Sequence, residues 1–249
     1  MWYFKPQIIM CRNAYDLSKV WCRFSKCLKD GKKMNFRWEQ LPEHRFDEFI
    51  DFKMNHFIKH EALHVVAGIP KSVEAMAEYR ELLVNISKKL SYYPSICCVD
   101  DETNKMIAVD GLILYKRGEI YENTLQAQTA EMKKFSKIVH ALNKLCRVPD
   151  ILEKYNVDKY FDDGDCVVHP DYRGYRITTS ISLLRQMVCM ANAVPLTGAW
   201  LTHIGTQRTT RREGWETIYE ISCEELEKKL AVKFENAPPK FIYTVKNVE

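Results

Sequence analysis

The sequence predicts an α/β (α+β) protein in which helices pack against one mixed sheet. Segments with strand character alternate with helical stripes along the whole chain, which is typical of this class. Residues 95–99 and 106–115 flank a polar turn and are expected to form a hairpin. Residues 132–146 carry apolar side chains at the period of a helix. With 249 residues, 46% of them hydrophobic, the chain can form one large domain with its own core.

Composition and charge argue against several classes of protein. The net charge is only +4 and the basic residues form no single run, so nucleic-acid binding is not expected. No apolar run reaches about 18 residues, so no membrane span is expected, and residues 1–10 do not resemble a signal peptide. None of the nine cysteines has the C-x-x-C spacing of a structural zinc site. We therefore expect reduced thiols and a cytoplasmic protein.

The first half of the chain is expected to contain an extension, one strand and two helices. Residues 1–33 are predicted to be an N-terminal extension, and residues 34–249 the domain itself. The domain begins with a short strand at residues 35–39. The two helices begin at Pro42 and after Ser72, and Gly68 and Pro70 separate them.

The second half alternates strands and helices. The elements expected after the helix at 132–146 are a short helix at 151–155, a strand at 165–169, a helix at 177–191, a strand at 196–202, a helix at 204–213, and strands at 214–221 and 240–245. No internal repeat is present. The order of these elements predicts a single sheet covered by helices.

The strand, turn and helix around residues 166–178 could bind an anion. A helix N-terminus presents unpaired N–H groups and the positive end of the helix dipole, which together favour a phosphate or pyrophosphate. Arg173 and Arg176 add positive charge at this turn. The same residues are also compatible with an ordinary turn whose arginines face solvent, because the turn contains one glycine only.

The segment Arg173-Gly-Tyr-Arg-Ile-Thr178 resembles the signature of the GCN5-related N-acetyltransferases (GNAT), which is Arg or Gln, two residues, Gly, one residue, and Gly or Ala. The segments that resemble the insect arylalkylamine N-acetyltransferases, in the right order, are Val20–Phe24, Phe57–Glu61, Ile96–Asp100, Leu152–Tyr160 and Gly214–Trp215. The resemblance implies the GNAT fold, a mixed twisted sheet splayed between its fourth and fifth strands with helices on both faces.

The resemblance also implies that acetyl-CoA is the acyl donor. In this family the strand before the signature pairs with pantetheine, and the turn holds the pyrophosphate. The residues implied for these contacts are Val167, Val168, His169, Arg173, Gly174, Tyr175, Arg176, Ile177 and Thr178. Arg176 stands where the family has its central glycine, and Thr178 where it has Gly or Ala. The Arg176 side chain either pairs with a phosphate or fills the cradle and abolishes binding.

Glu61 is the candidate general base, because a glutamate at this place has that role in the resembled branch. The reaction needs a base, since an alkylammonium must lose a proton before its nitrogen attacks a thioester. From the residues alone, Glu61 is a polar side chain at a helix end. His60-Glu-Ala-Leu-His64 also has the H-E-x-x-H spacing of zinc peptidases. No third ligand follows at the spacing that those enzymes use, so no metal is expected.

Thr202 and Thr206 follow the strand at 196–202. They have the spacing of two serines that are proposed to support proton movement in the resembled branch, and threonine keeps the hydroxyl. Both hydroxyls could instead cap the next helix. Thr210 stands where many GNAT enzymes have a tyrosine that protonates the leaving thiolate, so this chain leaves that role unfilled.

The resemblance, together with these residues, implies an acyl-CoA-dependent N-acyltransferase that is expected to be a monomer. It is expected to transfer acetyl from acetyl-CoA to a small primary amine by direct attack in a ternary complex. Cys166 lies on the strand before the turn, but the sequence offers it no paired histidine base, so no covalent intermediate is expected. The alternatives are a catalytically degenerate acyl-CoA-binding relative and, more remotely, a zinc peptidase.

Overall fold

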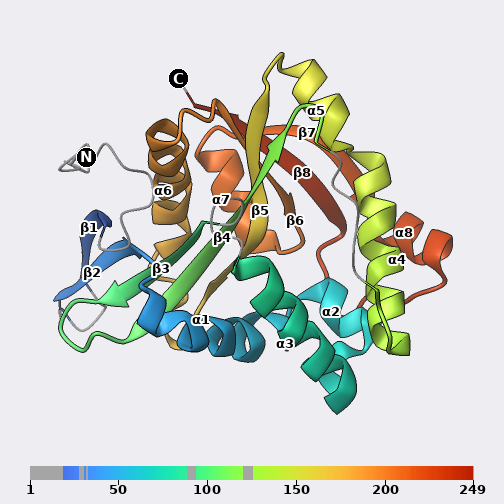
Figure 1. Ribbon diagram of the computed structural model, residues 1–249, viewed down its shortest axis with the longest axis horizontal. Helices are drawn as coiled ribbons and strands as arrows, with labels where there is room; N and C mark the ends of the chain where they lie inside the picture. Colours follow the sequence, from blue (N-terminus) through green and yellow to red (C-terminus); the bar gives the residue numbers. More distant parts are fainter. Residues whose placement is uncertain (1–18, 28–30, 32, 89–93, 120–125, 249) are drawn as a thin grey trace.

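An eight-stranded sheet forms the centre of the protein (Figure 1). The computed structural model describes residues 19–248 except 28–30, 32, 89–93 and 120–125. The strands are β1 Val20–Cys27, β2 Lys33–Gln40, β3 Ser95–Asp100, β4 Met106–Lys116, β5 Lys159–Val168, β6 Leu196–Leu201, β7 Glu216–Ser222 and β8 Lys240–Asn247. Their order is β1-β2-β3-β4-β5-β6-β8-β7, and β5 and β6 run parallel while the other neighbours are antiparallel. The predicted mixed sheet is confirmed.

Helices cover both faces of this sheet, as the sequence predicted (Figure 1). They are α1 Phe46–Lys53, α2 Ala62–Ala67, α3 Val73–Ser87, α4 Ala130–Leu145, α5 Val148–Lys154, α6 Ile177–Ala191, α7 Ile204–Arg212 and α8 Cys223–Leu230. Apolar side chains of α1 to α5 and α8 pack on one face, and those of α6 pack on the other. None of the described helices is both long and apolar enough to cross a membrane.

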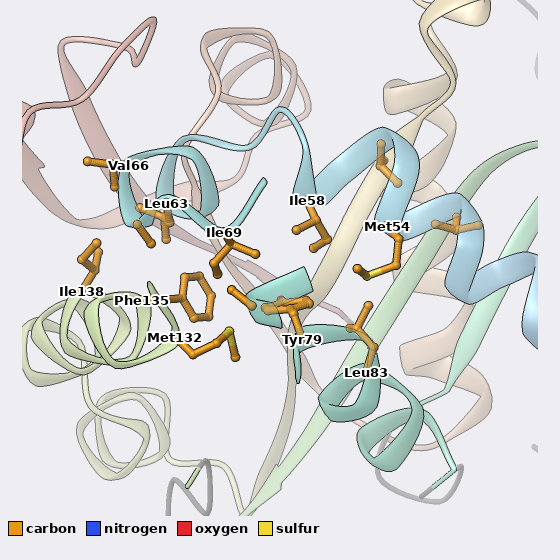
Figure 2. Packing of buried hydrophobic residues seen from close by; sticks show 14 of the residues in the cluster. Met54, Ile58, Leu63, Val66, Ile69, Tyr79, Leu83, Met132, Phe135 and Ile138 are labelled. Carbon is orange, nitrogen blue, oxygen red and sulfur yellow. The ribbon is translucent and has the colours of Figure 1, made fainter. Parts of the chain in front are cut away.

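A buried apolar cluster holds α2 in place against α3 and α4. Figure 2 shows Leu63 of α2, Tyr79 and Leu83 of α3, and Met132 and Phe135 of α4 pointing toward one another. Each is at most 9% exposed. Burying a large apolar side chain stabilises a fold by roughly 1.5–3 kcal/mol. The cluster therefore fixes the N-terminus of α2, where Glu61 lies.

Strand β1 lies within the segment that the sequence assigned to the extension. It pairs antiparallel with β2 and forms one edge of the sheet. Trp21, Cys22 and Phe24 are buried, whereas Arg23 is exposed and donates to Asp101 at 2.7 Å. A register shift near the start of the strand buries two successive residues, which obscures the alternating signal. Part of the predicted extension thus belongs to the sheet, and residues 1–18 lie outside the described residues.

Four further elements differ from the prediction. One is α2, because the structure has two helices, α1 and α2, where the sequence predicted a single helix before Gly68. β5 begins at Lys159 rather than 165, because Asp162 and Asp163 are poor strand formers and conceal its first half. α5 begins at Val148, since Pro149 in the first turn needs no hydrogen-bond acceptor. α8 was not predicted, although its N-cap Ser222 accepts a hydrogen bond from the Glu225 amide in the manner of a capping box.

The sheet opens between β5 and β6, the fourth and fifth strands of the prediction. Within the described residues these strands share one register pair, Phe161 with Thr197, near the start of each strand. Beyond it, residues 162–168 of β5 have no partner strand on the side of β6. The predicted splay is therefore confirmed. It leaves backbone N–H and C=O groups of β5 without a neighbouring strand at the carboxyl end.

A bulge bends β5 in the middle of the opening. The register with β4 shifts here, so that Gly164 and Asp165 together oppose one residue of β4. Asp165 has the positive φ of 76°. The buried Lys53 of α1 holds the bend, because its Nζ donates to the Gly164 carbonyl at 2.7 Å and lies 3.0 Å from the Asp165 carboxylate. The helix layer thereby fixes the curvature of the strand.

Candidate active site

Glu61 lies at the N-terminus of α2, on the helical layer that faces the opening of the sheet. Its backbone is extended, and its carboxylate accepts hydrogen bonds from the Leu63 amide at 2.9 Å and the His64 amide at 3.1 Å. These bonds satisfy two N–H groups that a helix start would otherwise leave unpaired. The side chain is only 8% exposed. The carboxylate is thus held in one orientation by the helix that it caps.

Thr202 connects this carboxylate to the sheet. Its Oγ1 donates to Glu61 Oε1 at 2.7 Å, directly after the end of β6. The structure therefore brings together two of the predicted catalytic residues. Thr206 behaves differently, because its hydroxyl donates to the His203 carbonyl at 2.7 Å in the first turn of α7. Thr206 therefore bonds back to the preceding backbone, whereas the N-cap of α7 is His203, whose side chain accepts from the Gly205 amide. Of the two threonines, Thr202 is the one that contacts Glu61.

His64 is a partner of Glu61 that the sequence prediction did not include. Its Nδ1 lies 2.5 Å from Glu61 Oε2, and its Nε2 is buried without a partner among the described residues. The ring is 3% exposed and packs against Tyr79 and Phe135, two residues that are visible in Figure 2. The spacing of Glu61 and His64 could have predicted this contact, because a residue three positions after a helix N-cap faces back toward the cap.

The H-E-x-x-H sequence does not form a zinc peptidase site. Zincins carry both histidines on one face of a continuous helix, whereas α2 begins only at Ala62, after Glu61 in an extended conformation. His60 therefore lies before the helix and is exposed, while His64 is buried against Glu61. In the part of the chain that the structure describes, no three potential metal ligands gather.

The turn before α6 keeps the backbone conformation of a glycine-containing turn. Arg176 is the N-cap of α6 with φ 58° and ψ 28°, in the left-handed region that favours glycine. Its side chain is exposed and makes no capping hydrogen bond, so it does not block the first N–H groups of the helix. Gly174 also has a positive φ, of 85°. The turn thus has a left-handed N-cap although an arginine stands where the resemblance implied a glycine.

The surroundings of this turn are electropositive. Burial is the main cause that lowers the pKa values of His56, His169 and His203, and the Arg173 guanidinium lowers all three further. The rings of His56 and His169 lie 4.5 Å apart. Arg173 itself is exposed, and its Nε donates to the Val168 carbonyl at 3.2 Å. The positive potential and the helix N-terminus together suit a multiply charged anion.

The carboxyl end of β5 joins the two parts of the site. Val167, Val168 and His169 pair with β4 on one side, through His169 N to the Ile107 carbonyl at 2.8 Å. On the side of β6 they adjoin the opening. This strand end leads into the turn before α6, and β6, which ends just before Thr202, lies across the opening. Its free edge is available for pairing with an extended ligand.

Known proteins resemble the chain in structure rather than in sequence. No family model and no curated protein sequence matches it. The structure of a candidate arylalkylamine N-acetyltransferase 7 from the yellow fever mosquito Aedes aegypti superposes with a TM-score of 0.80 and 20% identity, over 99% of this chain and 100% of that chain. The chain has the GNAT fold. Arylalkylamine N-acetyltransferase 2 from Aedes aegypti, with 15% identity over 86% of this chain and 99% of that chain (TM-score 0.71), has the same GNAT fold.

A polyamine N-acetyltransferase of Drosophila melanogaster also has the GNAT fold. Its structure superposes with a TM-score of 0.68 and 13% identity over 85% of this chain and 99% of that chain. The fold implied by the sequence is thereby confirmed. Within the GNAT fold of this protein, Glu61 and Thr202 meet at the end of β6, and Arg173 to Thr178 form the turn into α6. Their roles in catalysis and in binding acetyl-CoA remain predictions.

Proposed function

We propose that the protein is an acyl-CoA-dependent N-acyltransferase that transfers acetyl from acetyl-CoA to a small primary amine. The observation that carries the proposal is the Glu61 carboxylate, which Thr202 and α2 hold beside the open end of the sheet. The uncapped N-terminus of α6 adjoins the same opening. A base and an anion site on either side of one splay are what this transfer needs.

The chemistry is a direct transfer within a ternary complex. Glu61 accepts a proton from the alkylammonium, and the free amine attacks the thioester carbonyl, so that a C–N bond forms and the C–S bond breaks. Coenzyme A leaves as the thiol after it takes up a proton. N–H groups at the open edge of β5 are suited to stabilise the oxyanion. Burial raises the pKa of the Cys166 thiol well above its usual value, which makes a covalent cysteine intermediate unfavourable.

We propose that the acyl donor binds at the turn before α6 and at the carboxyl end of β5. Arg173 and Arg176 supply exposed positive charge, and the first N–H groups of α6 supply donors for a pyrophosphate. Val167 to His169 offer a strand edge to the pantetheine amides. Structures with the same fold include acetyltransferases named for arylalkylamines and for polyamines, which supports a small primary amine as the acceptor.

The test combines binding and turnover. Isothermal titration of the purified protein with acetyl-CoA is expected to show one saturable site. Release of coenzyme A thiol is then followed with tryptamine, dopamine and spermidine as acceptors. Binding without turnover for any amine would instead favour the catalytically degenerate relative, which the replacement of two small residues by Arg176 and Thr178 makes a specific second candidate. Absence of both binding and turnover would refute the acyltransferase.

A further inference from the structure

A second cleft lies on the same face of the sheet as Glu61, beside the point where β5 and β6 are still joined. It encloses about 530 Å³. Its floor is formed by one side chain from each of four strands: Tyr115 of β4, Asp162 of β5, Trp200 of β6 and Tyr243 of β8. The start of α5 closes one side. The mechanism above uses none of these side chains.

The floor of the cleft is aromatic. Tyr115 and Tyr160 oppose each other across β4 and β5, with ring centroids 5.5 Å apart. Trp200 and Tyr243 oppose each other across β6 and β8, with ring centroids 5.4 Å apart. Paired positions in a sheet present their side chains on the same face. Two aromatic pairs therefore flank Asp162, and aromatic rings attract cations that approach their faces.

Asp162 is the negative charge within this aromatic floor. Its carboxylate accepts hydrogen bonds from the Asp163 amide at 2.8 Å and from the Tyr160 hydroxyl at 3.4 Å. Burial raises the pKa of this carboxyl group. The buried Tyr243 hydroxyl also interacts with this carboxylate and lowers its pKa. The floor therefore holds a partly desolvated carboxylate beside two tyrosine hydroxyls.

The cations at the rim of the cleft are already paired with other carboxylates. Arg117 lies 3.1 Å from Asp158 and Arg147 lies 2.7 Å from Asp150. The third rim cation, Lys116, lies 3.3 Å from a glutamate. Across the described residues, no cationic side chain forms an ion pair with Asp162 itself. The buried Arg185, which pairs with Asp110 and Asp163, lowers the pKa of Asp162 without contacting it. A buried carboxylate is stabilised most by a charged partner, so the floor favours a ligand that brings a cation.

The cleft and the Glu61 site lie along the same strand, β6. Trp200 lines the cleft and stands two residues before Thr202, whose hydroxyl contacts Glu61. Asp162 follows the register pair of β5 and β6, beside Gly198. Four residues separate Gly198 from Thr202, a distance on the order of 13 Å at the rise of a strand.

We propose that Asp162 and its aromatic neighbours bind a second cationic group of the acyl acceptor. The preferred acceptor is then a linear diamine, polyamine or guanidino-amine, with one nitrogen at Glu61 and a cation several carbon atoms away at Asp162. The inference rests on the proposed function, because it places the reacting amine at Glu61. Gly198 makes room for this floor, because a Cβ there would clash with the Tyr243 hydroxyl and ring.

The test compares acceptors that differ by one charge. Butylamine and 1,4-diaminobutane have the same chain, and a series of longer diamines up to spermidine varies the spacing. The parent protein is expected to use the dications with a KM roughly 10- to 100-fold lower than the matched monoamines, as loss of a hydrogen bond to a charged group predicts. Asp162→Asn is expected to abolish that advantage without changing the KM of butylamine.

A control variant and a direct binding measurement keep the inference separate from the proposed function. Asp150→Asn removes the same charge near the rim, and the preference for dications is expected to persist. Spermidine binding by calorimetry to the parent and to Asp162→Asn needs no turnover, and a thermal melt shows that each variant is folded. Equal KM values for mono- and diamines, or equal spermidine affinity in both proteins, would overturn the role of Asp162. If no amine reacts but spermidine binding still depends on Asp162, the proposed transferase activity is refuted while the role of Asp162 in binding a cation stands.

Discussion

Replacement of Glu61 by glutamine tests the base directly. The change is nearly isosteric, and the remaining amide oxygen can still accept from the Leu63 and His64 amides or from the Thr202 hydroxyl. It cannot take a proton from an alkylammonium. Because the cap geometry is kept while the basic oxygen is lost, an effect on rate can be separated from an effect on folding.

The expected magnitudes follow from these contacts. A positioned general base contributes roughly 10²- to 10⁴-fold to the rate, so kcat/KM is expected to fall by that factor. Stability is expected to fall by about 1 kcal/mol, since the helix cap is weakened but retained. Glu61→Ala removes the cap and leaves His64 and Thr202 without their partner, so it is expected to cost about 3 kcal/mol.

The assay follows thiol release at saturating acetyl-CoA over a range of pH. The acidic limb of the parent's pH–rate profile is expected to disappear in Glu61→Gln. Ser72→Ala is the matched control, because Ser72 caps α3 by accepting from the Ala75 amide at 3.1 Å and belongs to no part of the site. It is expected to lower the melting temperature by a few degrees, on the order of 3 °C, at unchanged rate. If Glu61→Gln keeps the parent's rate and pH profile, Glu61 is not the base.

Three other changes have defined outcomes. Asp110→Ala removes two hydrogen bonds of the buried Arg185 guanidinium and leaves Asp163 as its remaining partner, so it is expected to cost about 3 kcal/mol in urea unfolding. Arg147→Ala at an exposed pair is expected to change the unfolding free energy by less than about 1 kcal/mol. Burial raises the pKa of Asp163 to about 7. The native state therefore holds a proton that the unfolded chain releases, so the unfolding free energy is expected to rise as pH falls from about 8 to about 5, and Asp163→Asn is expected to flatten this dependence. Arg176→Gly is expected to raise stability by about 1 kcal/mol by relieving the left-handed conformation, and to weaken acetyl-CoA binding roughly tenfold in calorimetry through loss of a charged contact.

Elements with strong local signals were predicted well. The hairpin of β3 and β4, the apolar stripe of α4 and the Ser72 cap of α3 all depend on residues a few positions apart. β1 and the first half of β5 were missed because a bulge and the run Asp162-Asp163-Gly164 disrupt the alternation of buried and exposed positions. In both cases sheet pairing with a neighbouring strand overrides the local preference.

The candidate site was predicted in part for the same reason. Glu61 and Thr202 were both expected, but Thr206 lies outside their contact and His64 inside it. Asp162 had no signal of its own, since the run Asp162-Asp163-Gly164-Asp165 is typical of a turn. Its place in an aromatic cleft depends on three other strands that pair with β5 or lie beyond it.

The sequence by itself determined the class of fold, the order of most elements and the turn that leads into α6, because periodicity, caps and glycine positions are properties of neighbouring residues. Only the tertiary structure decided that Thr202 meets Glu61, 141 positions away, and that Asp162 faces the same side of the sheet as this pair. Such contacts depend on strand register and on the packing of α2, which sum many weak interactions over the whole domain. It also decided that Arg176 keeps the left-handed turn with an exposed side chain, since a helix and a strand on either side fix its backbone.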